Sequence, residues 1–181
     1  ALEKKSFVWL GNPVRREVLV GDIARANKIF NLKQNLPVVF ALGGGTGSLK
    51  VNQLIVHAIQ HLEGVCQVIH LSGKERPQEL VERAVHHFDY YQVHQFFTTE
   101  MKDAYAAADL VIARGGFGTL TEIVALGKSA IIIPKQGHQE ENVAFLEKAG
   151  AVMLIDELTA DGNALAHVIK DLLADNIKRK Q

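Results

Sequence analysis

Val38-Val-Phe-Ala-Leu-Gly-Gly-Gly-Thr-Gly-Ser48 is a continuous apolar run followed directly by a glycine-rich turn. Apolar residues at three- and four-residue spacing begin at Leu49, immediately after it. A continuous apolar run of this length is typical of a strand buried on both faces of a sheet. The stretch therefore predicts a β-strand, a tight turn and an α-helix in succession.

The same unit repeats along the chain. Besides 38–42, apolar runs predict strands at 7–10, 65–69, 91–97, 110–113, 130–134 and 151–155. Helical spacing predicts helices at 49–62, 77–88, 101–108, 118–126, 139–149 and 164–175. This alternation favours right-handed βαβ crossovers, and hence a Rossmann-like α/β fold with helices on both faces of a parallel sheet. The segment 11–34 is the least regular, with a short helix expected to open at Arg15-Arg16-Glu17.

Composition limits the classes of protein that fit. With 181 residues and 48% hydrophobic content, the chain is expected to form a single domain over 1–181 without a disulfide or a structural metal. Lys+Arg and Asp+Glu are equal at 20 each, which argues against a nucleic-acid partner. The single cysteine, Cys66, lies in an apolar run and is interpreted as a buried strand thiol of a reducing, cytoplasmic compartment. No apolar run approaches the roughly 20 residues needed to span a bilayer.

In an open parallel sheet, ligands bind at the carboxyl ends of the strands, so the loops that follow the strands are the candidate sites. The first, 43–48, is a credible phosphate loop, because its glycines allow close approach to the N-terminus of the next helix. It is not a Walker A loop, and Ser48 stands where a dinucleotide fingerprint needs glycine. Val68-Ile-His70 also occupies the place of the expected acidic residue. A turn that only packs helix against strand is the alternative.

The second loop is Ala113-Arg-Gly-Gly-Phe-Gly-Thr-Leu-Thr-Glu122. Its helix should carry Thr119 in the first turn and Glu122 one turn later, with a buried face formed by Leu120, Ile123, Val124 and Leu126. A carboxylate at the position of Glu122 can accept two hydrogen bonds from a ribose diol. The alternative is a carboxylate that merely stabilises the helix N-terminus.

The third loop, 134–142, carries His138, Gln139 and Asn142, whose polar groups suit sugar hydroxyls. An exposed histidine without a ligand is the alternative. No second His or Cys lies at metal spacing around His138, so no metal site is expected, and no cofactor.

Several motifs occur together, in order, over nearly the whole chain. They are Gly11-Asn-Pro-Val-Arg15, the loop 43–48 with Asn52-Gln53, Phe97-Thr-Thr-Glu-Met101, the stretches 104–109 and 113–122, and His138-Gln139 with Asn142 and Leu146-Glu-Lys-Ala-Gly150. In this combination the sequence resembles the C-terminal domain of the MurG-type UDP-N-acetylglucosamine transferases of peptidoglycan synthesis.

The resemblance implies a GT-B enzyme, in which two Rossmann-like domains face each other and the C-terminal one binds the donor, UDP-N-acetylglucosamine. The reaction would be an inverting transfer to a lipid-linked muramyl-pentapeptide acceptor. The acceptor-binding N-terminal domain, with its catalytic base, has no counterpart in these residues, so this half alone is expected to bind the donor without turnover. The full-length protein would be cytoplasmic and peripherally associated with the inner face of the plasma membrane.

Carried over by position, the resemblance also assigns roles to residues. Glu122 would hold the ribose hydroxyls, the backbone of Thr98 would read the uracil edge, and Met101 would pack beside the base. Arg15 would border the nucleotide. The residues expected near the phosphates are Gly44, Gly45, Thr46, Gly118 and Thr119, and those facing the sugar are His138 and Gln139.

Two departures from the family pattern stand in these loops. Gly45 occupies a position where the family often has serine, so Thr46 or Ser48 would have to supply any hydroxyl contact to phosphate. Phe117 and Gly118 replace the usual small and aliphatic residues, which would alter the packing around the base or ribose.

Three other readings stay open. The chain could be the donor-binding subunit of a split transferase that acts with a membrane-anchored partner. It could be a fragment of a UDP-sugar epimerase, for which His138 with Glu140 is the one plausible acid/base cluster. It could also be a scaffold without a ligand.

Overall fold

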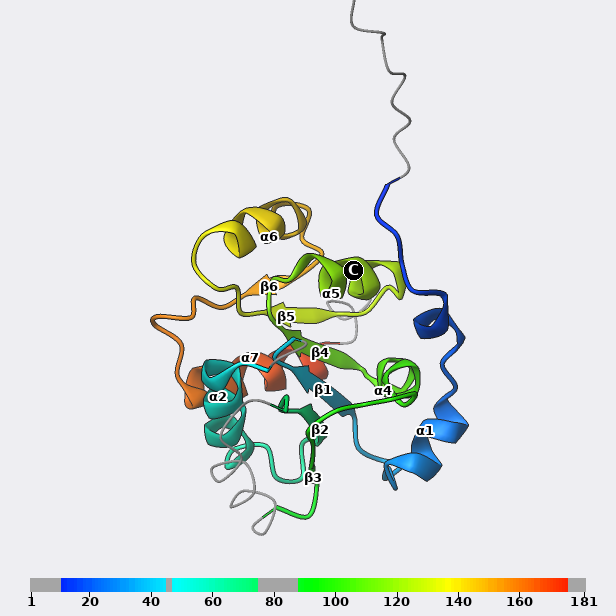
Figure 1. Cartoon of the computed structure of the whole chain (residues 1–181). Helices are drawn as coiled ribbons and strands as arrows, with labels where there is room; N and C mark the ends of the chain where they lie inside the picture. The colour runs from blue at the N-terminus through cyan, green and yellow to red at the C-terminus, as the bar shows by residue number, and fades with distance from the viewer. Residues whose placement is uncertain (1–10, 45–46, 75–87, 176–181) are drawn as a thin grey trace, which may run out of the picture.

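The computed structural model describes residues 11–44, 47–74 and 88–175. Within them, parallel strands form a single six-stranded sheet of order β3-β2-β1-β4-β5-β6 (Figure 1). The strands are β1 Val38–Leu42, β2 Gln67–Leu71, β3 Tyr91–His94, β4 Leu110–Ala113, β5 Ala130–Ile132 and β6 Met153–Leu154. The predicted α/β fold with a parallel sheet is confirmed. The strand predicted at 7–10 lies outside the described residues.

The helices follow the strands as predicted. They are the 3-10 helix η1 Arg16–Val20 and the α-helices α1 Ile23–Ile29, α2 Leu49–Ile59, α4 Met101–Ala107, α5 Phe117–Ala125, α6 His138–Lys148 and α7 Gly162–Ala174. The helix predicted at 77–88 falls almost entirely outside the described residues. Helix α1 is an addition to the prediction: Asp22 caps it by accepting a hydrogen bond of 2.6 Å from the backbone N–H of Arg25.

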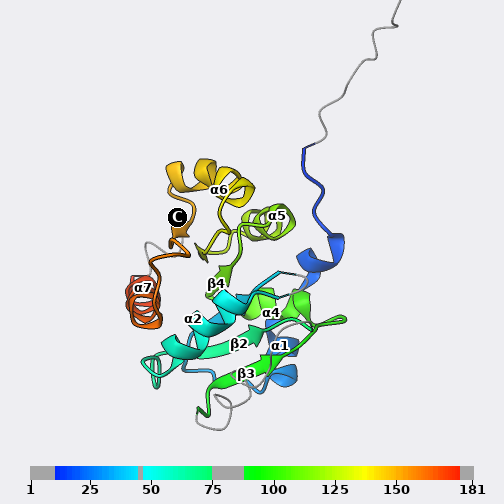
Figure 2. The same cartoon turned by 60° about the vertical axis from the view of Figure 1, so that its left-hand side comes forward.

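Helices cover both faces of the sheet, and each face has its own apolar core. On one face, α2 and α7 pack side by side over the strands, through residues such as Ile55, Ile59, Leu165 and Ile169 (Figures 1 and 2). Gly162 at the start of α7 is essential to this contact, since a Cβ there would lie 2.3 Å from the Cβ of His57. The other face is covered by α1, α4 and α5.

Some strand boundaries differ from the prediction. Strand β2 begins at Gln67 rather than at residue 65, because the backbone N–H groups of Val65 and Cys66 donate to the carbonyl of Leu62 in a turn. Cys66 is buried as expected, and burial raises the pKa of its thiol to about 12, so it has no nucleophilic character at neutral pH. The outer strands β3 and β6 are shorter than predicted.

The strand order places a topological switch point between β1 and β4. From β1 the chain winds outward through β2 to β3, and it then returns to β4 and winds the other way through β5 to β6. The last residues of β1 and β4, Leu42 and Ala113, lie opposite each other in register. The two glycine-rich loops that follow these strands therefore flank one crevice, which is where open α/β sheets bind ligands.

Candidate functional site

The loop between β1 and α2 needs its glycines. Gly44 and Gly47 have φ angles of +88° and +80°, and the N–H of Gly47 donates to the carbonyl of Gly44 at 3.1 Å. At Gly43 a Cβ would lie 2.4 Å from the backbone nitrogen of Ser48, so the chain folds tightly onto the start of α2. Gly45 and Thr46 lie outside the described residues.

Ser48 is the N-cap of α2, and its hydroxyl is already engaged. The oxygen accepts from the N–H of Val51 at 3.4 Å and from Nε of Arg114 at 2.9 Å. Ser48 can thus offer a phosphate only its hydroxyl hydrogen, because both accepting interactions hold the loop itself together.

Arg114 joins the loops of the site and had no assigned role in the sequence analysis. Besides Ser48, its guanidinium donates to the carbonyl of Ile133 at 3.1 Å and to Glu157 at 2.6 Å. The ion pair is largely buried, with side-chain exposures of 12% and 19%, and the guanidinium lowers the pKa of Glu157. The fork of Arg114 therefore fixes the loop after β1, the end of β5 and the segment after β6 relative to one another.

Glu122 lies in α5, the helix that follows the second glycine-rich loop, and is only 7% exposed, although it is a carboxylate. Its Oε1 accepts from Nε of Arg15 at 2.6 Å, and this hydrogen bond raises the pKa of Arg15. The structure thus brings together Arg15 and Glu122, two residues that the sequence analysis placed in the site separately. The Arg15 side chain is 59% exposed, so the carboxylate is closed off by a group that can move into solvent.

Tyr105 of α4 stands on the inner side of Glu122. Its hydroxyl is buried without a hydrogen-bond partner among the described residues. Burial, followed by the charge of Glu122, raises the pKa of this phenol, which stays protonated. Glu122 is therefore hydrogen-bonded to a cation, Arg15, and has the neutral phenol of Tyr105 as a neighbour.

The rest of α5 departs from the prediction in one respect. Gly118 and Thr119 lie in its first turn near the crevice, and Leu120 and Ile123 are buried as expected. Val124 was predicted to be buried, but it is 53% exposed. It faces a groove on the outer side of α5 instead of the core.

The loop after β3 carries Thr98 and Met101. Phe97 anchors it in the core, where its ring packs near those of Phe30 and Phe40. Thr98 is exposed, but its N–H already donates to Oε2 of Glu100 at 2.8 Å. Met101 begins α4 and packs, partly buried, against the core.

The loop between β5 and α6 lies against the second glycine loop. Asn142 donates to the carbonyl of Gly115 at 3.3 Å, and a Cβ on Gly115 would be 2.9 Å from the carbonyl oxygen of Gln139. Gln139 accepts from the N–H of Lys135 at 3.0 Å, while His138 is exposed. Glu140 accepts from the N–H of Gly137 at 2.9 Å. His138 and Glu140 are thus surface residues of a helix start, an arrangement that disfavours the acid/base pair of an epimerase.

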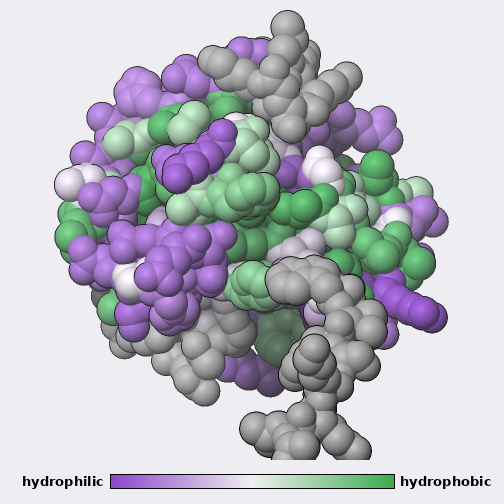
Figure 3. All heavy atoms as spheres, turned by 90° about the horizontal axis from the view of Figure 1, so that it is seen from above, coloured by the Kyte–Doolittle hydropathy of each residue, from purple (hydrophilic) through white to green (hydrophobic). Residues whose placement is uncertain are grey.

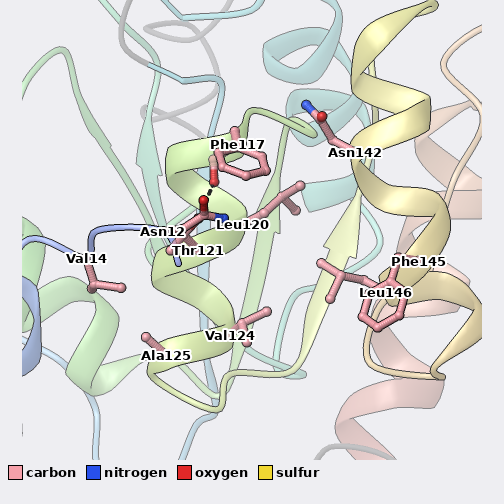
Figure 4. A pocket seen from close by; sticks show the side chains of 10 residues that line it. All are labelled: Asn12, Val14, Phe117, Leu120, Thr121, Val124, Ala125, Asn142, Phe145 and Leu146. Atoms are coloured by element: carbon pink, nitrogen blue, oxygen red, sulfur yellow. Dashed lines mark hydrogen bonds between the residues drawn. The ribbon is translucent and has the colours of Figure 1, made fainter. Parts of the chain in front are cut away.

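An apolar groove of about 500 Å³ runs between α5, α6 and the segment that precedes η1 (Figure 4). Phe117, Val124 and Phe145, all more than half exposed, face it. Apolar side chains gather on the face seen from above in Figure 3. None of the lining residues is charged, so this groove does not suit a pyrophosphate.

A buried hydrogen-bond chain links β3, β2 and the first turns of α2, and sequence reasoning missed it. Tyr91 Oη lies 2.6 Å from Nδ1 of His70, whose Nε2 lies 3.0 Å from Oδ1 of Asn52. Asn52 donates through Nδ2 to the carbonyl of Ser72 at 3.0 Å. Because a carbonyl only accepts, the directions are set: Nε2 of His70 carries the proton and Nδ1 accepts from Tyr91. Burial lowers the pKa of His70 to about 3, so the ring is neutral.

Within residues 11–44, 47–74 and 88–175, no helix combines the length and apolar character required to cross a membrane. The same residues contain no cluster of three or more His, Cys, Asp or Glu side chains placed to hold a metal ion.

Comparisons with known proteins agree with the fold. Residues 38–181 match the glycosyltransferase family 28 C-terminal domain. The UDP-N-acetylglucosamine–N-acetylmuramyl-(pentapeptide) pyrophosphoryl-undecaprenol N-acetylglucosamine transferase of Clostridium perfringens is 34% identical over 167 residues, which cover 90% of this chain and 46% of that protein. The chain spans about half the length of the curated relatives it matches.

Solved structures share the fold. The crystal structure of Acinetobacter baumannii MurG matches with a TM-score of 0.71 at 20% identity, covering 97% of this chain and 51% of that one. The UDP-GlcNAc 2-epimerase of Neisseria meningitidis matches with a TM-score of 0.59 at 12% identity, covering 83% and 40%. At these identities the likeness concerns the fold alone.

Proposed function

Since the chain belongs to the glycosyltransferase family 28 C-terminal domain family, we propose that it is the donor-binding half of an inverting N-acetylglucosaminyltransferase. The donor is UDP-N-acetylglucosamine. The acceptor, a lipid-linked muramyl-pentapeptide, binds to a second half that also associates peripherally with the cytoplasmic face of the membrane. This choice of donor and acceptor follows the activity of the related transferases.

The observation that carries the proposal is the buried carboxylate of Glu122 at the switch point. A buried carboxylate needs hydrogen-bond donors, and a ribose diol supplies two of them. Arg15, half in solvent, satisfies Glu122 in the free domain and leaves when the ribose arrives. The adjoining glycine loops supply backbone N–H groups for the pyrophosphate.

The remaining residues complete the donor site in this proposal. The backbone of Thr98 reads the uracil edge beside Met101, and the phosphates lie against the loop with Gly44, Gly45 and Thr46 and against Gly118 and Thr119. His138 and Gln139, exposed or half-buried at the start of α6, face the sugar.

The chemistry divides between two halves. The C4 hydroxyl of the muramyl sugar attacks the anomeric carbon of the donor from the face opposite the leaving UDP, and the configuration inverts. The N-termini of α2 and α5 stabilise the charge that develops on the departing pyrophosphate. General-base assistance to the attacking hydroxyl comes from the other half, so the chain alone binds the donor without turning it over.

Calorimetric titration tests the proposal. UDP and UDP-N-acetylglucosamine should bind, UDP-glucose should bind more weakly, and a guanosine diphosphate sugar should not bind. Product analysis after incubation with UDP-N-acetylglucosamine alone should find the donor unchanged. An epimerised sugar would favour the epimerase reading, and transfer to a lipid acceptor by these 181 residues would contradict the division of labour.

A further inference from the structure

We propose that Glu100 competes with the nucleobase of the donor. In the free domain, the carboxylate of Glu100 accepts hydrogen bonds from the backbone N–H groups that the base needs. This inference rests on the proposed function, because it assumes that the Thr98 segment reads a uracil. It adds a residue that sets the affinity and base preference of the donor site.

The side chain of Glu100 folds back over the loop that follows β3. One oxygen of Glu100, Oε2, accepts from the N–H of Thr98 and from the N–H of Thr99, both at 2.8 Å. Thr98 and Thr99 are exposed, whereas Glu100 is half-buried. Both N–H groups, which belong to exposed residues, are therefore already engaged by one carboxylate oxygen.

The charge of Glu100 makes it a strong competitor. The N–H of Thr99 is the largest of several influences that keep the pKa of Glu100 below its ordinary value, so the side chain is ionised at neutral pH. A carboxylate accepts shorter and stronger hydrogen bonds than a neutral carbonyl oxygen does. The O4 of a uracil must therefore displace a better acceptor before it reaches the N–H of Thr98.

The loop beneath the carboxylate is firm, so binding must move the side chain and not the backbone. Phe97 is 6% exposed and packs in an aromatic group with Phe30, Phe40 and His94. Asp103, in the first turn of α4, accepts two hydrogen bonds from Arg25 of α1, at 2.7 and 2.6 Å. With both flanks fixed, the rotation of the Glu100 side chain into solvent is the simplest way to free the two N–H groups.

The same carboxylate biases the choice of base. While Glu100 stays in place, the edge of the loop presents an acceptor, and a base that offers an exocyclic amino group can donate to it. Once Glu100 leaves, the edge presents N–H donors, which a uracil carbonyl accepts and an amino group does not. Glu100 thus lowers the affinity for uridine nucleotides relative to the affinity for cytidine nucleotides.

Calorimetry with UDP and CDP on the wild-type chain, Glu100→Gln and Glu100→Ala tests this inference. UDP affinity should rise about three- to tenfold in Glu100→Ala, the range of one net hydrogen bond, and by less in Glu100→Gln. CDP affinity should not rise. Glu147→Ala, which removes an exposed carboxylate at the far end of α6, serves as the matched control and should leave both affinities unchanged.

A ligand that lacks a base distinguishes competition between Glu100 and the nucleobase from a structural role of Glu100 in the loop that carries Thr98. Ribose 5-phosphate should bind the wild-type chain and Glu100→Ala equally. Amide hydrogen exchange should be slow at Thr98 and Thr99 in the free wild-type chain and faster in both Glu100 variants. Equal or weaker binding of UDP by the variants, or an equal gain for ribose 5-phosphate, would overturn the competitor role. If no form of the protein binds UDP, the proposed function itself fails and this inference with it.

Discussion

Arg15 and Glu122, 107 positions apart in the chain, are joined by a hydrogen bond of 2.6 Å between Nε and Oε1. One partner is largely exposed and the other largely buried, with side-chain exposures of 59% and 10%. Such a half-exposed pair contributes only about 0–1 kcal/mol to stability. Its importance is therefore local: it gives the buried carboxylate of Glu122 a hydrogen-bond donor.

Substitution of Glu122 should affect binding far more than folding. Glu122→Ala should weaken UDP binding by about 1.5–3 kcal/mol, because the ribose loses charged hydrogen bonds. The midpoint of thermal unfolding should change little, since the Arg15 pair is weak. Calorimetry and circular dichroism measure the two effects, and Glu147→Gln on α6 is the control. Unaltered UDP affinity in Glu122→Ala would remove Glu122 from the site.

Arg114 should be more important for stability than Arg15. Arg114→Lys keeps the charge but cannot reproduce the fork that reaches Ser48, Ile133 and Glu157, and should lower the free energy of unfolding by about 1–3 kcal/mol. Urea titration measures this loss. A Lys variant as stable as the wild type would show that the three contacts do not hold the loops.

The contribution of Arg114 should also fade in acid. Arg114 lowers the pKa of Glu157 from its ordinary value of 4.5. A carboxylate whose folded pKa is lowered stabilises the protein above the unfolded pKa, and this contribution disappears as the pH falls through the folded pKa. The stability gap between wild type and Arg114→Met should thus be full at neutral pH and shrink below about pH 4.5. A gap that stays constant into acid would contradict the ion-pair origin of the effect.

His70 should make the domain sensitive to mild acid. Its pKa falls from 6.5 to about 3 on burial, so the unfolded chain takes up a proton on this ring between these values and the folded chain does not. Stability should decrease as the pH drops below 6.5, with a slope that approaches about 1.4 kcal/mol per pH unit. Denaturant titrations of the wild type and of His70→Gln measure this slope.

The slope should largely vanish in His70→Gln and persist in His61→Gln, which changes an exposed histidine. Nitrogen chemical shifts should report a neutral ring with its proton on Nε2. A protonated His70 near pH 5 would contradict the buried chain from Tyr91 to Asn52.

Two neighbouring glycines should respond differently to alanine. At Gly44 a Cβ meets open space, so Gly44→Ala adds only the strain of a φ of +88°, about 1–2 kcal/mol. At Gly43 the Cβ would lie 2.4 Å from the nitrogen of Ser48, so Gly43→Ala must displace the loop and the α2 cap. Thermal unfolding and UDP titration should therefore show the larger loss for Gly43→Ala. Gly127→Ala, with φ of +59° and open space, is the control for strain alone. Equal losses at Gly43 and Gly44 would refute the close contact with Ser48.

The elements predicted best were those whose residues are buried on every side. Strands β1 and β4 are continuous apolar runs in the centre of the sheet, and their boundaries matched the prediction. Helix α1 was missed as a separate element because it is short and has only one fully buried residue, Ala26. Val65 and Cys66 misled the placement of β2, since burial in a turn leaves the same apolar signature as burial in a strand.

Features of the candidate site could be predicted where the sequence of a single loop carries the signal. They could not be predicted where a residue depends on partners that are distant in the sequence. The glycine turns carry such a local signal, whereas the ribose role of Glu122 follows from the family resemblance and stays a prediction. The role of Arg114 depends on Glu157 and Ile133, and that of His70 depends on Tyr91 and Asn52, which no local pattern connects. An arginine directly after a buried strand, as in Ala113-Arg114, was the one signal available, because such a cation needs a partner.

The packing of α7 on α2 also affects when the candidate site can fold during protein synthesis. Helix α2 carries the first glycine loop at its start and emerges early from the ribosome, yet the apolar side that it shares with the sheet is covered by α7, the last element described. Domains fold as units, so the nascent chain keeps this side exposed until residues such as Leu172 and Leu173 have been translated. Translation of α7, rather than synthesis of the loop, therefore sets the moment at which the candidate site acquires its shape.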